Sequence, residues 1–174
     1  MQGEHARRSE IDFATGVATR LIGRLGTSFA DLLQLAGGVR NGHKLKAVIP
    51  GGSSMPVLPG DTMMGLTMDY DALQKAGSGL GSGAVIVMDE TTCMVRACRR
   101  ISRFYYAESC GQCTPCREGT GWMYRMLTRI ADGQASLDDL QMLKASAGQI
   151  EGHTICAFGE AAAWPVQGFL RHFW

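Results

Sequence analysis

The segment ESCGQCTPCREG, residues 108–119, contains three cysteines, each separated from the next by two residues. These are Cys110, Cys113 and Cys116, and such a run presents three thiolates from one tight loop. Three close cysteines and one remote cysteine suit a [4Fe–4S] cluster, whose four irons each bind one thiolate. Cys156, in the segment GHTIC just past a predicted helix end, is the natural fourth ligand. The spacing therefore favours an iron–sulfur site.

The spacing alone does not decide which metal binds or whether other residues are ligands. Zinc sites more often use two C-x-x-C pairs in tetrahedral geometry, but a zinc loop is an alternative interpretation of this run. His153, three residues before Cys156, is an alternative ligand. Cys98 falls on the apolar face of a predicted helix and is expected to be a core residue, and Cys93 has no partner at ligand spacing.

Three further motifs could carry chemistry, and none does so convincingly. The glycines of GLGSG, residues 79–83, precede a strand, whereas a dinucleotide-binding loop must follow one. The segment PGGSS, residues 50–54, is better explained as a turn than as an anion cradle. The arginines of one predicted helix form either a solvated face or a docking surface for an acidic partner: Arg96, Arg99, Arg100 and Arg103. No hydrolytic residue set is present.

Composition limits the class of protein. The chain has 174 residues, 45% apolar residues and a net charge of +1, which argues against a dedicated nucleic-acid binder. No apolar stretch is long enough to span a membrane, and the N-terminus does not have the pattern of a secretory signal. Six cysteines without export indicate reduced thiols or metal ligands, so a cytoplasmic location is expected.

The first half of the chain is expected to contain both strands and helices. Thr27 or Ser28 can cap a helix that ends at two glycines, and Val17 to Leu25 is at best a short strand. Further elements are expected as a strand at 45–49, a helical turn at 70–75 and a buried strand at 84–89, with a Pro/Gly-rich loop after the first strand.

From about residue 92 the pattern becomes helical. Apolar residues recur at helical spacing from Met94 to Tyr105 and again from Trp122 to Ile130. Ser136 and Asp139 form a variant capping box that opens a third helix. The C-terminus is expected to form two helical pieces, with Pro165 in the first turn of the second. The predicted class is α+β, with a boundary near residues 89–93 and a bundle of about four helices after it.

Two long motifs carry a family resemblance. ESCGQCTPCREGTGW followed by IEGHTICAFGEAAAWPVQGFLRHF closely resembles the C-terminal part of the NADH-oxidising flavoprotein subunit of respiratory complex I. Upstream, LLQLAGGV, LKAVIPGGSS and GSGLGSGAVIVMDETTCMVRA resemble the β-grasp domain of the SLBB type in that subunit. The resemblance runs from about Thr27 to Trp174. NAD-linked formate dehydrogenases and NAD-reducing hydrogenases have similar segments, so they are alternative parents.

The resemblance implies a domain plan and a set of cofactors. Residues 1–24 are unmatched, 25–89 correspond to an incomplete β-grasp unit, and 92–174 correspond to the cluster-binding helical domain. Cys110, Cys113, Cys116 and Cys156 would hold the [4Fe–4S] cluster, which in the family takes electrons from FMN reduced by NADH. The FMN and NAD domain lies N-terminal to the β-grasp unit, and this chain is expected to be too short to contain it. We therefore expect no NADH oxidation by this chain alone.

The resemblance also implies partners and a location. The expected partners are other subunits of the complex I peripheral arm, namely the [2Fe–2S] subunit of the 24 kDa type and the large iron–sulfur subunit. A separately encoded flavin domain is a further possible partner, and neither nucleic acid nor membrane insertion is expected. The location would be the cytoplasmic side of the inner membrane, or the matrix side in mitochondria. A non-redox interaction module, with zinc or no metal at the cysteines, is the competing hypothesis.

Overall fold

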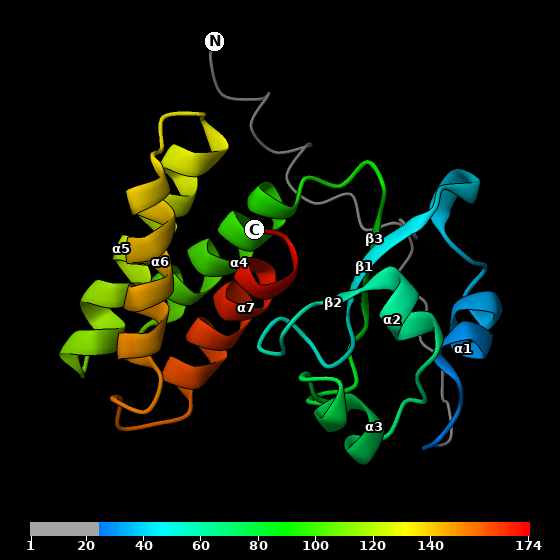
Figure 1. Cartoon of the computed structure of the whole chain (residues 1–174). Helices are drawn as coiled ribbons and strands as arrows, with labels where there is room; N and C mark the ends of the chain where they lie inside the picture. Colours follow the sequence, from blue (N-terminus) through cyan, green and yellow to red (C-terminus); the bar gives the residue numbers. More distant parts are fainter. Residues whose placement is uncertain (1–24) are drawn as a thin grey trace, which may run out of the picture. The chain divides into compact units, whose positions relative to one another are not determined.

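The computed structural model describes residues 25–174 and has an α+β fold, as the sequence predicts (Figure 1). The described residues divide into two compact units, one that ends at Thr92 and one that spans Cys93–Trp174. The weak strand expected at Val17 to Leu25 lies almost entirely outside the described residues. Within residues 25–174, no helix combines the length and apolar character needed to cross a bilayer.

The N-terminal unit is built on a small antiparallel sheet in the strand order β2-β1-β3. The central strand pairs Val48 with Leu58 on one side and with Val87 on the other. The elements in chain order are α1 (Phe29–Leu35), the 3-10 helix η1 (Arg40–Gly42), β1 (Leu45–Ile49), β2 (Leu58–Pro59), α2 (Gly60–Met64), α3 (Tyr70–Lys75) and β3 (Ile86–Asp89).

Local caps explain why two helices of this unit begin where they do. The Ser28 hydroxyl accepts a hydrogen bond from the Asp31 N–H at 3.0 Å, which confirms Ser28 as the cap of α1. The Asp69 carboxylate caps α3 in the same way by accepting from the Ala72 N–H at 2.8 Å. The core beneath them is a single cluster of buried side chains: Phe29, Leu33, Val48, Leu58, Met63, Met68, Leu73 and Val87.

The segment after β1 differs from the expected Pro/Gly-rich loop, because it contains β2 and α2. Val57, Leu58 and Met63 are fully buried there. Burial of these side chains outweighs the local preference of the neighbouring prolines and glycines for turns. The strand expected at 84–89 is also shorter than predicted and begins at Ile86.

The C-terminal unit is a closed bundle of four helices, in agreement with the prediction. The helices are α4 (Met94–Glu108), α5 (Thr114–Ala131), α6 (Leu137–Ile150) and α7 (Phe158–His172). Each of α4 and α6 packs against both α5 and α7, which closes the ring (Figure 1). The interior contains Met123, Leu143 and Ala147, each with no exposed surface.

The two helical pieces expected at the C-terminus are a single helix, so that prediction is wrong. Pro165 lies in the middle of α7 rather than at the start of a new helix. A proline inside a helix removes one backbone hydrogen bond and usually costs about 3 kcal/mol. Burial of Ala162, Val166 and Phe169 on the same helix offsets this cost.

The start of α6 confirms the predicted capping box. The Ser136 hydroxyl accepts from the Asp139 N–H, and the Asp139 carboxylate accepts from the Ser136 N–H at 2.7 Å. Asp139 is only 2% exposed and also pairs with Arg129 at 3.2 Å. The hydrogen bond from the Ser136 N–H, with help from the Ser136 hydroxyl and Arg129, holds the pKa of Asp139 below its usual range despite burial.

This depressed pKa predicts a pH-dependent contribution to stability. Because the native pKa lies below the unfolded value, the stabilisation is complete above the unfolded pKa of about 3.9 and is lost as pH falls through the native pKa. The variant Asp139→Asn should therefore melt at a lower temperature than the wild type at pH 7, and the difference should shrink in acid. Thermal melts followed by circular dichroism test this, with the exposed Asp138→Asn as control; a difference independent of pH would contradict it.

Candidate metal centre

The three clustered cysteines surround the N-terminus of α5. Cys110 is exposed in the loop after α4, Cys113 is the N-cap of α5, and Cys116 lies in the first turn, where it is 5% exposed. Pro115, the second residue of α5, has no N–H and so leaves no unsatisfied donor at its position in the first turn. The unpaired N–H groups and the dipole at a helix N-terminus favour negative charge. The site is therefore suited to thiolates and to an anionic group bound by them.

Arg117 holds the cysteine loop against the start of α5. Its guanidinium donates to the Gly111 carbonyl at 3.1 Å and to the Thr114 hydroxyl at 3.4 Å. Gly111 has a positive φ of 75°, a conformation that favours glycine and lets the loop turn between Cys110 and Cys113. Arg117 also pairs with Glu118 at 3.0 Å. The arrangement fixes the loop against the first turn of α5.

Cys116 is the most protected of the candidate ligands. Burial raises the pKa of its thiol, a hydrogen bond with Ser109 opposes this rise, and the charges of Cys113, Cys110 and Cys156 add to it. The Ser109 oxygen lies 3.2 Å from the Cys116 sulfur and accepts from the Gly111 N–H at 3.4 Å. Either group can donate while Cys116 is a thiol, whereas only the Ser109 hydroxyl can donate once Cys116 is a thiolate.

Cys156 lies in the connection between α6 and α7 and is exposed. This connection and the Cys110–Cys113 loop lie at the same end of the four-helix bundle (Figure 1). The electrostatic effect of Cys156 on the Cys116 thiol agrees with this proximity. The structure therefore brings together two segments that are about 40 residues apart in sequence, as the iron–sulfur interpretation requires.

The four thiols do not converge on a single point. Within residues 25–174, no three His, Cys, Asp or Glu side chains are close enough to bind one metal ion. The four thiolates of a [4Fe–4S] site surround one cluster, but each binds a different iron, so they lie farther apart than the ligands of a single ion. Four thiols from two segments, three of them at or just before a helix N-terminus, fit such a group in their chemistry.

The remaining cysteines and His153 have other surroundings. Burial raises the pKa of the Cys98 thiol to about 12, so this thiol stays protonated, in keeping with its predicted place in the core. Cys93 is exposed at the N-cap of α4. His153 is exposed, and its Nδ1 lies 2.8 Å from the Glu151 carbonyl oxygen, so this nitrogen takes part in the structure of the loop.

Sequence reasoning missed a carboxylate that joins the Cys156 loop to α7. Glu151 Oε1 accepts from Trp164 Nε1 at 2.7 Å, and Oε2 accepts from Gln167 Nε2 at 2.8 Å. These hydrogen bonds hold the pKa of Glu151 below its usual range, and the one from Gln167 has the larger effect. No local pattern could reveal them, because the partners lie 13 and 16 residues away. Ser109 was also missed, although its place directly before Cys110 was a usable signal.

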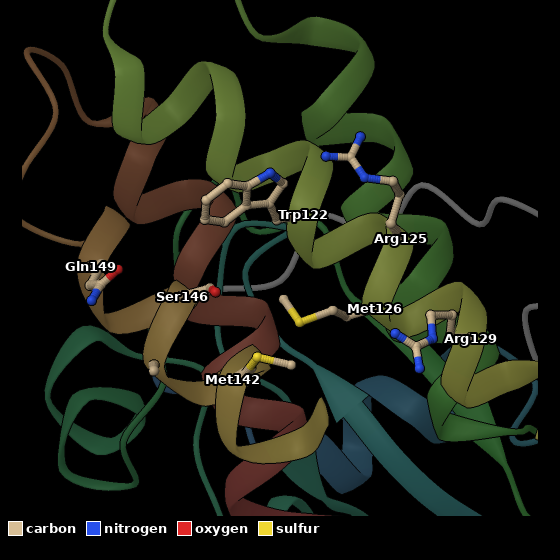
Figure 2. A pocket seen from close by; sticks show the side chains of 8 residues that line it. Trp122, Arg125, Met126, Arg129, Met142, Ser146 and Gln149 are labelled. Carbon is tan, nitrogen blue, oxygen red and sulfur yellow. The ribbon is translucent and has the colours of Figure 1, made fainter. Parts of the chain in front are cut away.

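A groove between α5 and α6 lies apart from the cysteines (Figure 2). Its volume is about 510 Å³, and its walls combine apolar side chains with two arginines of α5. Trp122 and Met142 are about half exposed there, at 54% and 51%. The groove is lined by Trp122, Arg125, Met126, Arg129, Met142, Ala145, Ser146 and Gln149. Because none of these is a cysteine, a histidine or a carboxylate, the groove takes no part in the metal centre.

Comparison with known proteins gives consistent matches. Residues 96–174 match the family described as the NADH-ubiquinone oxidoreductase-F iron-sulfur binding region. The F-type NADH-quinone oxidoreductase subunit of Rickettsia felis is 54% identical over 151 residues, which is 86% of this chain and 36% of that protein. An F-type subunit of the NADH-quinone oxidoreductase of Rhizobium meliloti is 57% identical over 138 residues, or 79% of this chain and 32% of that protein.

A solved structure shares the fold. An NAD+-reducing [NiFe]-hydrogenase, crystallised in the H2-reduced state, superposes with a TM-score of 0.75 and 29% identity. The match covers 86% of this chain and 25% of the hydrogenase chain. This chain spans about a third of the length of the curated relatives it matches.

Proposed function

We propose that this chain, whose residues 96–174 belong to the NADH-ubiquinone oxidoreductase-F iron-sulfur binding region family, carries electrons through a [4Fe–4S] cluster held by Cys110, Cys113, Cys116 and Cys156. The observation that carries the proposal is the meeting of two cysteine-bearing segments at one end of the bundle. When bound, such a cluster accepts and releases one electron at a time.

The surrounding residues have separate tasks in this proposal. Burial of Cys116 limits the access of water to one ligand, and the N-terminus of α5 stabilises negative charge on the Cys113 and Cys116 thiolates. Arg117 fixes the loop through the Gly111 carbonyl. Ser109 would donate a hydrogen bond to the Cys116 sulfur when that sulfur is a ligating thiolate, which can only accept. Charge, burial and hydrogen bonds to sulfur are the means by which a protein sets the reduction potential of such a group.

The wider role that we propose is in the NADH dehydrogenase module of a complex I-type enzyme. The chain would take electrons from FMN that NADH has reduced and would pass them toward quinone. Its partners would be a [2Fe–2S] subunit of the 24 kDa type and a large iron–sulfur subunit, on the cytoplasmic or matrix side of the membrane. Residues 25–89 would form an SLBB-type β-grasp unit and residues 92–174 the cluster domain. The identities of 54% and 57% to NADH-quinone oxidoreductase subunits support this assignment.

A second candidate is the corresponding part of an NAD-reducing hydrogenase. The superposition with such an enzyme, at a TM-score of 0.75, is the observation that favours it. Sequence identity is lower for this match, at 29%. We therefore prefer the quinone oxidoreductase.

Electron paramagnetic resonance of anaerobically purified protein tests the electron-transfer function. We expect no signal from the oxidised protein and about one unpaired electron per chain after reduction with dithionite, because the cluster takes up one electron. A colourless protein that binds zinc, or that stays silent after attempted anaerobic reconstitution of a cluster, would overturn the proposal and favour an interaction module.

Removal of the Ser109 hydroxyl should lower the reduction potential. A hydrogen bond to the Cys116 sulfur stabilises the more negative, reduced state, and a difference of about 1 kcal/mol between the two states corresponds to roughly 40 mV for one electron. A redox titration followed by electron paramagnetic resonance should show this shift for Ser109→Ala. Ser109→Thr keeps the hydroxyl and should restore the potential; an unchanged potential in Ser109→Ala would contradict the assigned role.

A further inference from the structure

The Cys156 loop is the part of the metal centre with the least regular structure. It joins Ile150 at the end of α6 to Phe158 at the start of α7 without a helix or strand. Cys156 is exposed, and its neighbour Ile155 is 75% exposed. Apolar burial therefore does little to fix these two residues, and hydrogen bonds must supply the order.

The Glu151 carboxylate links this loop to residues of α7 that lie 13 and 16 positions later in the sequence. It lies at the start of the loop, and both of its oxygens are used, one by Trp164 at 2.7 Å and one by Gln167 at 2.8 Å. Trp164 and Gln167 are three residues apart on α7 and so lie on one face of that helix. Hydrogen bonds to a charged acceptor are stronger than neutral ones. The start of the loop is therefore fixed to the middle of α7.

A second set of hydrogen bonds continues from Glu151 to Cys156. The Glu160 carboxylate of α7 accepts from the Gly152 N–H at 3.0 Å, so it binds the loop at the residue directly after Glu151. The Thr154 hydroxyl donates to the Cys156 carbonyl at 2.9 Å. Gly159 lies directly against the Thr154 side chain, where any Cβ would collide with it. The loop is thus held at several points between Glu151 and the proposed ligand.

We propose that Glu151 is a positioning residue, which holds the Cys156 loop on α7 so that the fourth thiol is in place before a metal group binds. The inference rests on the proposed function for the role of Cys156 as a ligand. The ordering of the loop, in contrast, is a property of the polypeptide itself. The Glu151 carboxylate accepts from Trp164 and Gln167, which lie on α7, and not from the Cys156 thiol. Its effect passes through Trp164, Gln167 and the backbone of the loop.

Hydrogen exchange of the cluster-free protein tests the ordering directly. Loss of the charge-assisted hydrogen bonds in Glu151→Ala should speed exchange of the amides of residues 152–159 by about tenfold. Trp164→Phe removes one donor and keeps an aromatic side chain, so it should speed exchange in the same peptide. Because the two residues act through one contact, the double variant should exchange no faster than Glu151→Ala. Glu151→Gln keeps an acceptor and should restore part of the protection.

Asp138→Asn is the matched control, because it removes a carboxylate of the same bundle that is exposed at the start of α6. It should leave exchange of residues 152–159 unchanged. Unchanged exchange in Glu151→Ala, or faster exchange spread evenly over all four helices, would overturn the inference. In protein loaded with a cluster, Glu151→Ala should also broaden the paramagnetic resonance spectrum, and Glu151→Gln should narrow it again. If wild-type protein binds no cluster while the exchange result holds, the proposed function fails and the ordering role stands.

Discussion

Substitution of Cys156 by serine should abolish stable binding of the cluster. Cys156 is exposed, so the change removes a ligand without opening a cavity in the core. Loss of an outer-shell partner already costs roughly 10–100-fold in metal affinity, and loss of a direct ligand should cost more. Iron and acid-labile sulfide in the anaerobically purified variant should therefore fall far below the wild-type content.

Cys93→Ser is the matched control for this substitution, because Cys93 is also exposed and lies at the N-cap of α4. It should leave the iron content unchanged. Equal iron in Cys156→Ser and wild type would remove Cys156 from the ligand set and would direct attention to His153. Equal loss in both variants would point to general damage rather than to ligation.

The same variant tests whether cluster binding stabilises the bundle. Cys156 stands on a different connection from the other three cysteines, so a shared cluster would link the start of α5 to the start of α7. Binding to the folded state alone adds to its stability. Reconstituted wild type should melt at a higher temperature than its cluster-free form, whereas Cys156→Ser should show no such difference. Equal melting of both wild-type forms would contradict the link.

Truncation of Met123 should destabilise the C-terminal unit strongly. Met123 has no exposed surface and lies on α5 in the bundle interior. Met→Ala substitutions in a core cost about 2–5 kcal/mol, which is a large part of the total stability of a small domain. Met142→Ala on α6 is the control, because this methionine is 51% exposed and should cost less than about 0.5 kcal/mol.

Urea unfolding followed by tryptophan fluorescence measures the loss of stability of each variant in the C-terminal unit. All three tryptophans, Trp122, Trp164 and Trp174, belong to the C-terminal unit, so the signal reports on the bundle. The midpoint for Met123→Ala should fall well below those of wild type and Met142→Ala. Similar midpoints for the two variants would mean that Met123 is not part of the packed interior.

Elements with local signals were predictable from the sequence. Three features depend only on residues that are close together in the sequence. They are the cap at Ser28, the capping box of Ser136 and Asp139, and the strand at Leu45–Ile49. The sequence also singled out Cys110, Cys113, Cys116 and Cys156 as candidate ligands, and the structure places the two connections that carry the Cys110–Cys113 loop and Cys156 at one end of the bundle.

Elements that depend on distant contacts were not predictable. β2 and α2 exist because Leu58 and Met63 are buried in the core, although the surrounding prolines and glycines indicate a loop. The continuity of α7 through Pro165 rests on packing of the bundle. The contacts of Glu151 join residues in different elements, and no periodic pattern marks them. The ligand set itself and the boundaries of the β-grasp unit stay predictions.

The most direct test of the central claim is the content of iron and acid-labile sulfide per chain in anaerobically purified wild-type protein. We expect about four irons and four sulfides per chain, as a single [4Fe–4S] cluster requires. One zinc per chain, or no metal after attempted reconstitution, would contradict the claim that these four cysteines form an electron-transfer site.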